Sequence, residues 1–490
     1  MANTLVIFGA SGDLTRRKLI PALYRLCRKR NLPADTRIVG VSRTPFGTDR
    51  WRDELRESVQ EFASAQYTPE SWDRFANRLH YLTGDLSDVA SCREVAEQLD
   101  TLEQQTATNR VYYLATKPAL YHAAIGVLGA SGLVAPANGA RRVIIEKPFG
   151  TDLASAQALN QELHEVFAED QVYRIDHYLG KESVQNLLVL RFANSIFEPL
   201  WNRNYVDHIQ ITVAEEVTLG RRAGYYDTAG VLRDMFQNHL LQLMMITAME
   251  APARYLPEFV RDEKVKVLQS VRPLTGPHVA AETIRGQYQG YRQEEGISPD
   301  SQTATFGVVK LHVDNWRWQG VPFYLRSGKG MSCRTTQIVT QFRNPPQHLF
   351  VQDQRFIPDA NRLVIQIQPA EGIQLHFQTK VPEAGMRLRM TDLDFRFQDE
   401  FPEELPDAYQ RLLLDALNGD ASLFARSDEV ELAWKIFDPI IAGWEAGEGP
   451  PLEVYERGWW GPESSTEWMR GQGREWFDVC PVLSHHPPLG

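Results

Sequence analysis

Short apolar runs alternate with helical stretches over the first 176 residues of the chain. The stretch 15–30 has helical spacing, because Leu19, Leu23 and Leu26 recur every three or four residues. Strands that alternate with helices indicate a parallel, doubly wound α/β sheet of the Rossmann type. The expected strands are TLVIFG (4–9), RIVGVS (37–42), HYLTGDL (80–86), RVYYLA (110–115) and RRVIIE (141–146).

The pattern changes at about residue 181. A helical stretch over 181–201 is followed by strand-like runs without regular helices between them, which predicts a large, mostly antiparallel sheet in an α+β domain. We therefore expect a Rossmann domain over 1–176 and an α+β domain over 177–490. A further helix is expected over 399–417, and the tryptophan-rich segment 456–477 is predicted to be polar-aromatic surface or a contact segment. The expected strands are HIQITVAEEV (208–217), TFGVVKLHV (305–313), VPFYLRSG (321–328), QIVTQFR (337–343), RLVIQIQ (362–368) and IQLHFQT (373–379).

The composition narrows the classes of partner. A formal net charge of −11 over 490 residues disfavours non-specific binding to nucleic acid or anionic membranes, so a phosphate-bearing ligand needs a local basic pocket. The cysteines Cys27, Cys92, Cys333 and Cys480 have no CxxC spacing, and we expect reduced thiols with neither zinc nor a structural disulfide. The apolar run 4–10 is too short for a signal peptide, and no stretch approaches the roughly 20 apolar residues of a membrane span. We expect a cytoplasmic protein.

The first expected strand runs directly into the segment GASGDLTRRKL (9–19). Its glycines permit a tight turn and a close approach of the backbone to a pyrophosphate, and amides at the start of the following helix supply donors. The spacing is not the usual G-x-G-x-x-G, so the interpretation depends on the order of strand, turn and helix. We predict a dinucleotide site whose contacts are Gly9, Ser11, Gly12, Asp13 and Leu14.

The end of the second expected strand discriminates between the two nicotinamide coenzymes. Folds that prefer NAD place an acidic residue there to bind the ribose hydroxyls, whereas this chain reads VGVSRTP with Arg43. An arginine would pair with the 2′-phosphate of NADP, and a solvated loop arginine is the structural alternative. We predict NADP as the coenzyme and leave the use of NAD open.

Three further motifs follow in order, EKPFG (146–150), RIDHYLGKE (174–182) and RDMFQNHL (233–240). Together with GASGDL they resemble the glucose-6-phosphate dehydrogenases of bacterial type. The resemblance implies a Rossmann coenzyme domain and a substrate domain with a large sheet, through which homodimers or homotetramers form. It also implies oxidation of D-glucose 6-phosphate at C1 to 6-phospho-D-glucono-1,5-lactone, with hydride transfer to NADP. That reaction is the first step of the oxidative pentose phosphate pathway.

The resemblance assigns the sugar phosphate to His177, Tyr178 and Lys181. His177 and Lys181 are four residues apart where a helix is expected to begin, so both can face one point beside free backbone amides. A capping or core histidine is the structural alternative. Lys147 follows the strand 141–146, at the end where open α/β sheets bind ligands, and the resemblance gives it contacts to both substrate and coenzyme. The EKP triplet alone indicates only an oxidoreductase of the sugar type.

His239 lies on a helix that we expect from Thr228 to Glu250, with Asp227 as its N-cap. Periodicity alone favours a histidine at the edge of the core. The resemblance instead makes His239 the general base that removes the C1 hydroxyl proton, a step that suits an imidazole. It assigns the carboxylate that orients this imidazole to Asp176.

The remaining substrate contacts implied by the resemblance are Glu215, Asp234, Lys329 and Arg334. The resemblance assigns this contact to Glu215 and not to Glu216, the acidic residue directly after it. Relatives often carry lysine at the position of Arg334, so this residue departs from the common pattern.

Two rival functions are less compatible with these residues. A dehydrogenase of the same plan that acts on an unphosphorylated hexose or inositol has no need of both His177 and Lys181. A non-catalytic paralogue that regulates an active dehydrogenase has no structural need of His239, Asp176 and Lys147 together.

Overall fold

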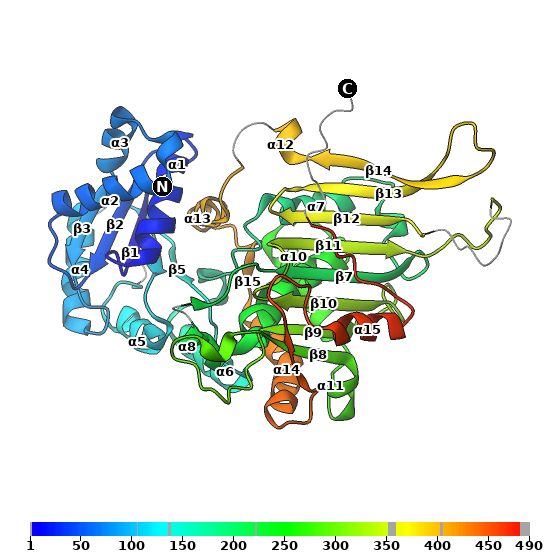
Figure 1. Cartoon of the computed structure of the whole chain (residues 1–490). Helices are drawn as coiled ribbons and strands as arrows, with labels where there is room; N and C mark the ends of the chain where they lie inside the picture. Colours follow the sequence, from blue (N-terminus) through cyan, green and yellow to red (C-terminus); the bar gives the residue numbers. More distant parts are fainter. Residues whose placement is uncertain are drawn as a thin grey trace. The chain divides into compact units, whose positions relative to one another are not determined.

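The chain forms two compact units (Figure 1). The computed structural model describes residues 2–104, 106–135, 139–220, 223–350, 359–401 and 405–480. Unit 1 comprises Met1–Lys181, Pro252–Asp262 and Pro406–Glu431, and unit 2 comprises Glu182–Ala251, Glu263–Leu405 and Leu432–Gly490. Neither unit is therefore one continuous stretch of chain, a feature that the sequence pattern did not indicate.

Unit 1 is built on a seven-stranded sheet with the order β15-β6-β5-β4-β1-β2-β3. Every pair of neighbours is parallel except β15 and β6, which are antiparallel. The order of the six parallel strands is that of a Rossmann fold, which confirms the expected fold class. The strands are β1 (Ala2–Phe8), β2 (Thr36–Ser42), β3 (Leu79–Thr83), β4 (Thr108–Leu114), β5 (Arg141–Ile145), β6 (Val172–Ile175) and β15 (Phe424–Ala425).

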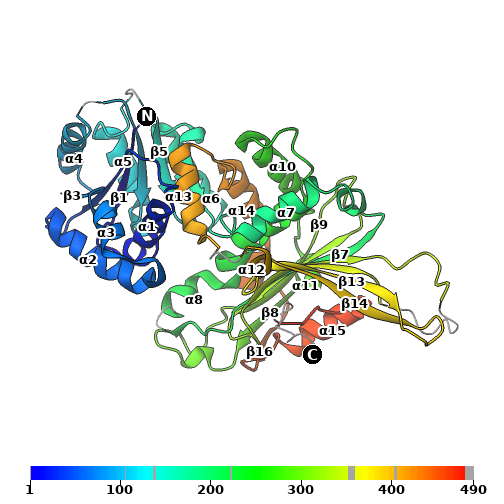
Figure 2. The same ribbon diagram turned by 90° about the horizontal axis from the view of Figure 1, so that it is seen from above.

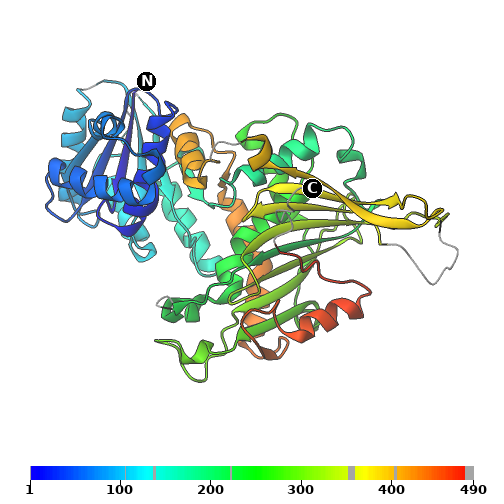
Figure 3. The ribbon, with the colours of Figure 1, turned by 45° about the horizontal axis from the view of Figure 1, so that its top comes forward.

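Helices lie on both faces of the parallel strands of unit 1 (Figure 3). Because both faces are covered, the strands are mostly buried, and β1 is buried from Asn3 to Phe8. Helix α13 belongs to a late segment of the chain but packs against α1 (Figure 2). The helices are η1 (Thr15–Leu19), α1 (Ile20–Arg28), α2 (Thr48–Phe62), α3 (Pro69–Ala76), α4 (Val89–Leu102), α5 (Tyr121–Ala130), α6 (Leu153–Val166) and α13 (Ala408–Asn418).

Unit 2 is built on a nine-stranded sheet with the order β14-β13-β12-β11-β7-β10-β9-β8-β16. Its pairs are antiparallel except β7 with β10 and β8 with β16. The mostly antiparallel sheet expected for the second domain is thus confirmed. The strands are β7 (Val206–Ala214), β8 (Thr283–Tyr288), β9 (Phe306–His312), β10 (Pro322–Gly328), β11 (Thr335–Phe342), β12 (Arg362–Gln368), β13 (Gly372–Lys380), β14 (Leu388–Arg396) and β16 (Leu452–Tyr455).

Helices cover both faces of this sheet, with α7 and α15 on opposite sides (Figure 2). Helices α10 and α14 each contain residues of both units. No helix in the described part of the chain combines the length and the apolar character needed to cross a membrane. The helices are α7 (Glu182–Phe192), α8 (Ala223–Val231), η7 (Leu232–Leu240), α9 (Leu241–Ala248), α10 (Pro257–Gln269), α11 (Pro277–Glu282), α12 (Phe397–Glu400), α14 (Ser427–Glu445) and α15 (Glu463–Gly471).

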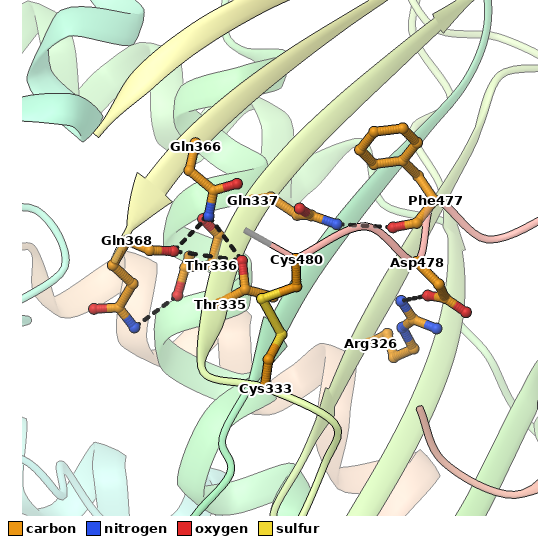
Figure 4. Close-up of a disulfide and its surroundings, with 10 residues drawn as sticks. All are labelled: Arg326, Cys333, Thr335, Thr336, Gln337, Gln366, Gln368, Phe477, Asp478 and Cys480. Carbon is orange, nitrogen blue, oxygen red and sulfur yellow. Dashed lines mark hydrogen bonds and ion pairs between the residues drawn. A yellow bond between two sulfur atoms is a disulfide. The ribbon is translucent and has the colours of Figure 1, made fainter. Parts of the chain in front are cut away.

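The expectation of four reduced cysteines is wrong. Cys333 and Cys480 form a disulfide, whereas Cys27 and Cys92 are free (Figure 4). The two half-cystines are 147 positions apart, so spacing along the chain gave no signal of their pairing. They meet because the segment that ends at Cys480 returns across the sheet of unit 2.

Hydrogen bonds attach this returning segment to three strands of the sheet. The Gln210 side chain on β7 accepts a bond from the Phe477 amide at 3.0 Å and donates one to the Glu475 carbonyl at 2.8 Å. The Gln337 amide on β11 donates to the Phe477 carbonyl at 2.9 Å, and Arg326 on β10 pairs with Asp478 (Figure 4). The tryptophan-rich end is therefore partly core, since Trp476 is buried at 4.2 Å from the Arg326 guanidinium.

We expect Cys480→Ser to lower the thermal midpoint of the protein, because a cross-link that closes so long a loop contributes about 2–5 kcal/mol. Differential scanning calorimetry measures the shift, and dithiothreitol should bring the wild type to the midpoint of the variant. Cys27→Ser, which removes a free and only half-buried thiol, is the matched control. Finding four titratable thiols in the unreduced, denatured protein would contradict the cross-link.

Candidate active site

The turn after β1 is tight and lies close to the chain that follows β4. Gly9 has φ +90°, and a Cβ there would lie 2.4 Å from the carbonyl oxygen of Ala115. The Gly12 amide donates to the Gly9 carbonyl at 2.9 Å, and Thr15 Oγ1 donates to the same oxygen at 3.2 Å. Gly9 is thus the residue that lets the turn pass close to the end of β4.

The other predicted coenzyme residues lie on this turn and at the end of β2. Ser11 and Asp13 are exposed, and Leu14 is half-buried at the start of the helix. Arg43 is exposed directly after β2, the neighbour of β1 in the sheet. The position that carries an acidic residue in NAD-preferring folds therefore carries a solvent-accessible guanidinium, which fits a 2′-phosphate.

The EKPFG segment leaves the carboxyl end of β5 and is held through Glu146. The Glu146 carboxylate accepts hydrogen bonds from Tyr113 at 2.5 Å and Tyr409 at 3.1 Å, and the Tyr121 hydroxyl donates to its carbonyl at 3.1 Å. Burial raises the pKa of Glu146, although both tyrosines and the charge of Lys147 oppose that rise. These anchors fix the chain on one side of Lys147, which is half-buried at the strand end.

The RIDHYLGKE segment leaves the carboxyl end of β6, the strand next to β5. Asp176 is buried, and its carboxylate accepts a hydrogen bond from the Tyr178 amide at 2.9 Å. The rings of His177 and Tyr178 are 4.9 Å apart, and Lys181 Nζ lies 4.5 Å from the centre of the Tyr178 ring. The three residues predicted to bind the phosphate therefore form one compact group within unit 1.

Unit 2 brings three of the predicted substrate residues together. Glu215 follows β7 and Lys329 follows β10, and the parallel register pairs the last residues of the two strands, Ala214 and Gly328. Lys329 Nζ forms an ion pair with the Glu215 carboxylate and a second one with Asp234 at 3.3 Å. The sequence pattern had not indicated that these two strands are neighbours.

Lys329 is only 8% exposed, so its charge depends on these partners. Burial alone would lower the pKa of Lys329, but the carboxylates of Asp234 and Glu215 outweigh it and raise the pKa above the ordinary value. The ammonium is therefore charged at neutral pH and holds both carboxylates in place. Glu216 and Arg334 differ from this group, since both are exposed.

His239 lies on η7, where the helix has π-type hydrogen bonding. The residue is 1% exposed, and its amide donates to the Asn238 side chain at 2.6 Å. Wider π-type turns inside α-helices frequently occur at functional sites. The burial of His239 agrees with the helical periodicity, which places this residue beside the core. Its chemical role stays a prediction.

The helix around His239 differs from the expected single span with an Asp227 cap. Helix α8 already begins at Ala223, and the chain kinks at Gly230 before η7 and α9 continue to Ala248. Asp227 lies inside α8 and is therefore not the residue before a helix. Its carboxylate accepts hydrogen bonds from Tyr291 and Ser301. Apart from Gly230 itself, nothing in the local residue pattern indicates the kink.

Unit 1 has a Rossmann sheet with a glycine turn and a basic residue after β2, and the sheet of unit 2 carries a buried lysine between carboxylates. Together these features define the class of protein, a nicotinamide-dependent oxidoreductase with a polar substrate. The comparisons with known proteins name its family. Residues 6–186 match the family model described as "Glucose-6-phosphate dehydrogenase, NAD binding domain", and residues 188–477 match "Glucose-6-phosphate dehydrogenase, C-terminal domain". The chain belongs to the glucose-6-phosphate dehydrogenase family.

Curated relatives and solved structures agree with this membership. "Glucose-6-phosphate 1-dehydrogenase 2" of Mycobacterium tuberculosis is 45% identical over 96% of this chain and 94% of its own length. "Glucose-6-phosphate 1-dehydrogenase" of Aggregatibacter actinomycetemcomitans is 44% identical over 96% of each chain. A structure described as "Glucose-6-phosphate dehydrogenase in complex with its substrate glucose-6-phosphate" has a TM-score of 0.88 and 34% identity, with coverage of 97% and 98%. The enzyme from Mycobacterium avium has a TM-score of 0.83 and 36% identity, with coverage of 97% and 99%.

We expect Gly9→Ala to weaken NADP binding by about tenfold or more, because backbone strain at such a site costs about 1–3 kcal/mol. Fluorescence titration with NADP measures the dissociation constant. Gly47→Ala is the matched control, since a Cβ at Gly47 would meet nothing within 4 Å. An unchanged dissociation constant in Gly9→Ala would exclude this turn from the coenzyme site.

Proposed function

We propose that this protein oxidises D-glucose 6-phosphate at C1 to 6-phospho-D-glucono-1,5-lactone and that NADP receives the hydride. The observation that carries the proposal is the family match over both parts of the chain, which includes the likeness to a relative described with its substrate glucose 6-phosphate. The reaction opens the oxidative pentose phosphate pathway.

His177, Tyr178 and Lys181 bind the phosphate, and Lys147 contacts both the substrate and the coenzyme. Support comes from the compact group that the first three form and from the fixed strand end that carries Lys147. A protein with a net charge of −11 needs such a local group to bind a dianion.

Glu215, Asp234, Lys329 and Arg334 contact the rest of the substrate. Carboxylates accept hydrogen bonds from sugar hydroxyls, and a charged lysine between two of them keeps their oxygens in a fixed arrangement. Arg334 follows Cys333, whose disulfide secures the loop on one side.

His239 removes the proton of the C1 hydroxyl while the C1 hydrogen leaves with its electron pair, so that a carbonyl forms at C1. NADP, when bound, accepts that hydride. Asp176 stabilises the resulting imidazolium and selects the ring tautomer of His239. The proposal for Asp176 is supported by its burial, because a carboxylate shielded from water interacts more strongly with a positive charge.

Gly9, Ser11, Gly12, Asp13 and Leu14 bind the coenzyme diphosphate, and Arg43 binds the 2′-phosphate. The strand, turn and helix geometry at Gly9 and the exposed guanidinium of Arg43 support this assignment. A cytoplasmic location and a homodimer or homotetramer, both implied by the family, complete the proposal.

The function is tested by following the absorbance of reduced nicotinamide with purified protein. We expect rapid reduction of NADP that requires glucose 6-phosphate, slower reduction of NAD and none with free glucose. Turnover with glucose alone would indicate the enzyme for unphosphorylated sugars. Coenzyme binding without any turnover would indicate the regulatory paralogue.

The division of labour between the two histidines is tested by His239→Asn and His177→Asn. We expect His239→Asn to lower kcat by about 100- to 10,000-fold with little change in KM, because it removes the general base. His177→Asn should mainly raise the KM for glucose 6-phosphate. Steady-state kinetics measures both, and equal effects of the two substitutions would refute the assignment.

A further inference from the structure

An aromatic ring lies against the buried ammonium of Lys329. The centre of the Tyr226 ring is 5.4 Å from Lys329 Nζ, within the range of a cation–π contact. The ammonium thus contacts the carboxylates of Glu215 and Asp234 as well as this ring. Tyr226 comes from α8, an element that the sequence motifs of the family did not single out.

The hydroxyl of Tyr226 takes no part in the contact with Lys329. Tyr226 is 4% exposed, and among the described residues its buried hydroxyl has no hydrogen-bond partner. Burial, together with the charges of Asp234 and Glu215, raises the pKa of Tyr226 well above its usual value, so the side chain stays neutral. The part of the residue that interacts with Lys329 is therefore the ring.

The position of the ring is fixed through its neighbour Asp227. The Asp227 carboxylate accepts hydrogen bonds from Tyr291 at 2.8 Å and from Ser301 at 2.5 Å, and Thr303 donates to the Asp227 carbonyl at 2.7 Å. Tyr226 itself packs in the same buried cluster as Tyr291. Contacts within the protein core therefore fix the position of the Tyr226 ring, and no ligand is needed for this.

We infer that Tyr226 is a positioning residue for substrate binding, whose ring holds the Lys329 ammonium between Glu215 and Asp234 so that both carboxylates present a fixed set of oxygens to the sugar. The inference rests on the proposed function, because the roles of those three residues belong to it. A ring is suited to this task because its face attracts a cation without adding a donor that competes with the sugar hydroxyls.

The ring and the hydroxyl are separated by comparing Tyr226→Phe with Tyr226→Leu. Tyr226→Phe keeps the ring, so we expect wild-type KM values and an unchanged or higher thermal midpoint, since it removes an unsatisfied buried hydroxyl. Tyr226→Leu removes the ring, and we expect the KM for glucose 6-phosphate to rise by about tenfold, while the KM for NADP stays the same.

Tyr324→Leu is the control for the loss of a buried ring as such. Tyr324 lies in the same cluster, but its hydroxyl donates to Gln472 and accepts from Arg474. We expect its thermal midpoint to fall without a selective rise in the KM for glucose 6-phosphate. A comparable selective rise in this control would assign the effect to general loosening of the core and would overturn the inference.

A second measurement does not depend on turnover. The rate at which formaldehyde and borohydride methylate Lys329, followed by peptide mass spectrometry, should be slow in the wild type and in Tyr226→Phe and at least about threefold faster in Tyr226→Leu. If the wild-type protein did not oxidise glucose 6-phosphate, the proposed function would be refuted. The methylation rates would still test the contact between the Tyr226 ring and the Lys329 ammonium. Equal rates in all three proteins, or a defect in Tyr226→Phe as large as in Tyr226→Leu, would overturn the role of the ring.

Discussion

The parallel pairing of β7 with β10 is the constraint on which the substrate residues of unit 2 depend. In an antiparallel pair the ends of two neighbouring strands lie at opposite edges of the sheet, whereas parallel strands end at the same edge. The register that pairs Ala214 with Gly328 places Glu215 beside Lys329. Backbone bonds continue the pairing past the strands, from the Glu215 amide to the Gly328 carbonyl and from the Met331 amide to the Glu215 carbonyl.

The same pairing explains how a lysine is kept charged inside an acidic protein. An unpaired ammonium in the interior costs several kcal/mol of desolvation, and two carboxylates at close range offset that cost. Lys329 follows β10, Glu215 follows β7 and Asp234 lies on η7. Removing the lysine would leave two carboxylates close together without the cation that they share. The arrangement is a local electrostatic unit whose geometry is set by the sheet.

Parallel strands also place the predicted site residues of unit 1. Its strands are all parallel apart from β15, so the glycine turn, Arg43, Lys147 and Asp176 all follow carboxyl ends of strands. The sequence pattern therefore predicted much of this unit, because the glycine turn, Arg43 and Lys147 each follow a strand that its apolar residues make recognisable. The strand β6 was missed, since the four residues VYRI include an arginine and form too short a run.

The sequence by itself determined the fold class, the glycine turn after the first strand and the family, because these depend on local periodicity and on motifs of adjacent residues. Only the tertiary structure decided which distant positions meet, such as Cys333 with Cys480 and Lys329 with Glu215 and Asp234. Tyr226 and Asp227 show the limit most clearly, because nothing in the string AGYYD distinguishes a helix cap from a carboxylate bonded to Tyr291 and Ser301. Strand order and burial set these contacts, and neither is encoded in the spacing of neighbouring residues.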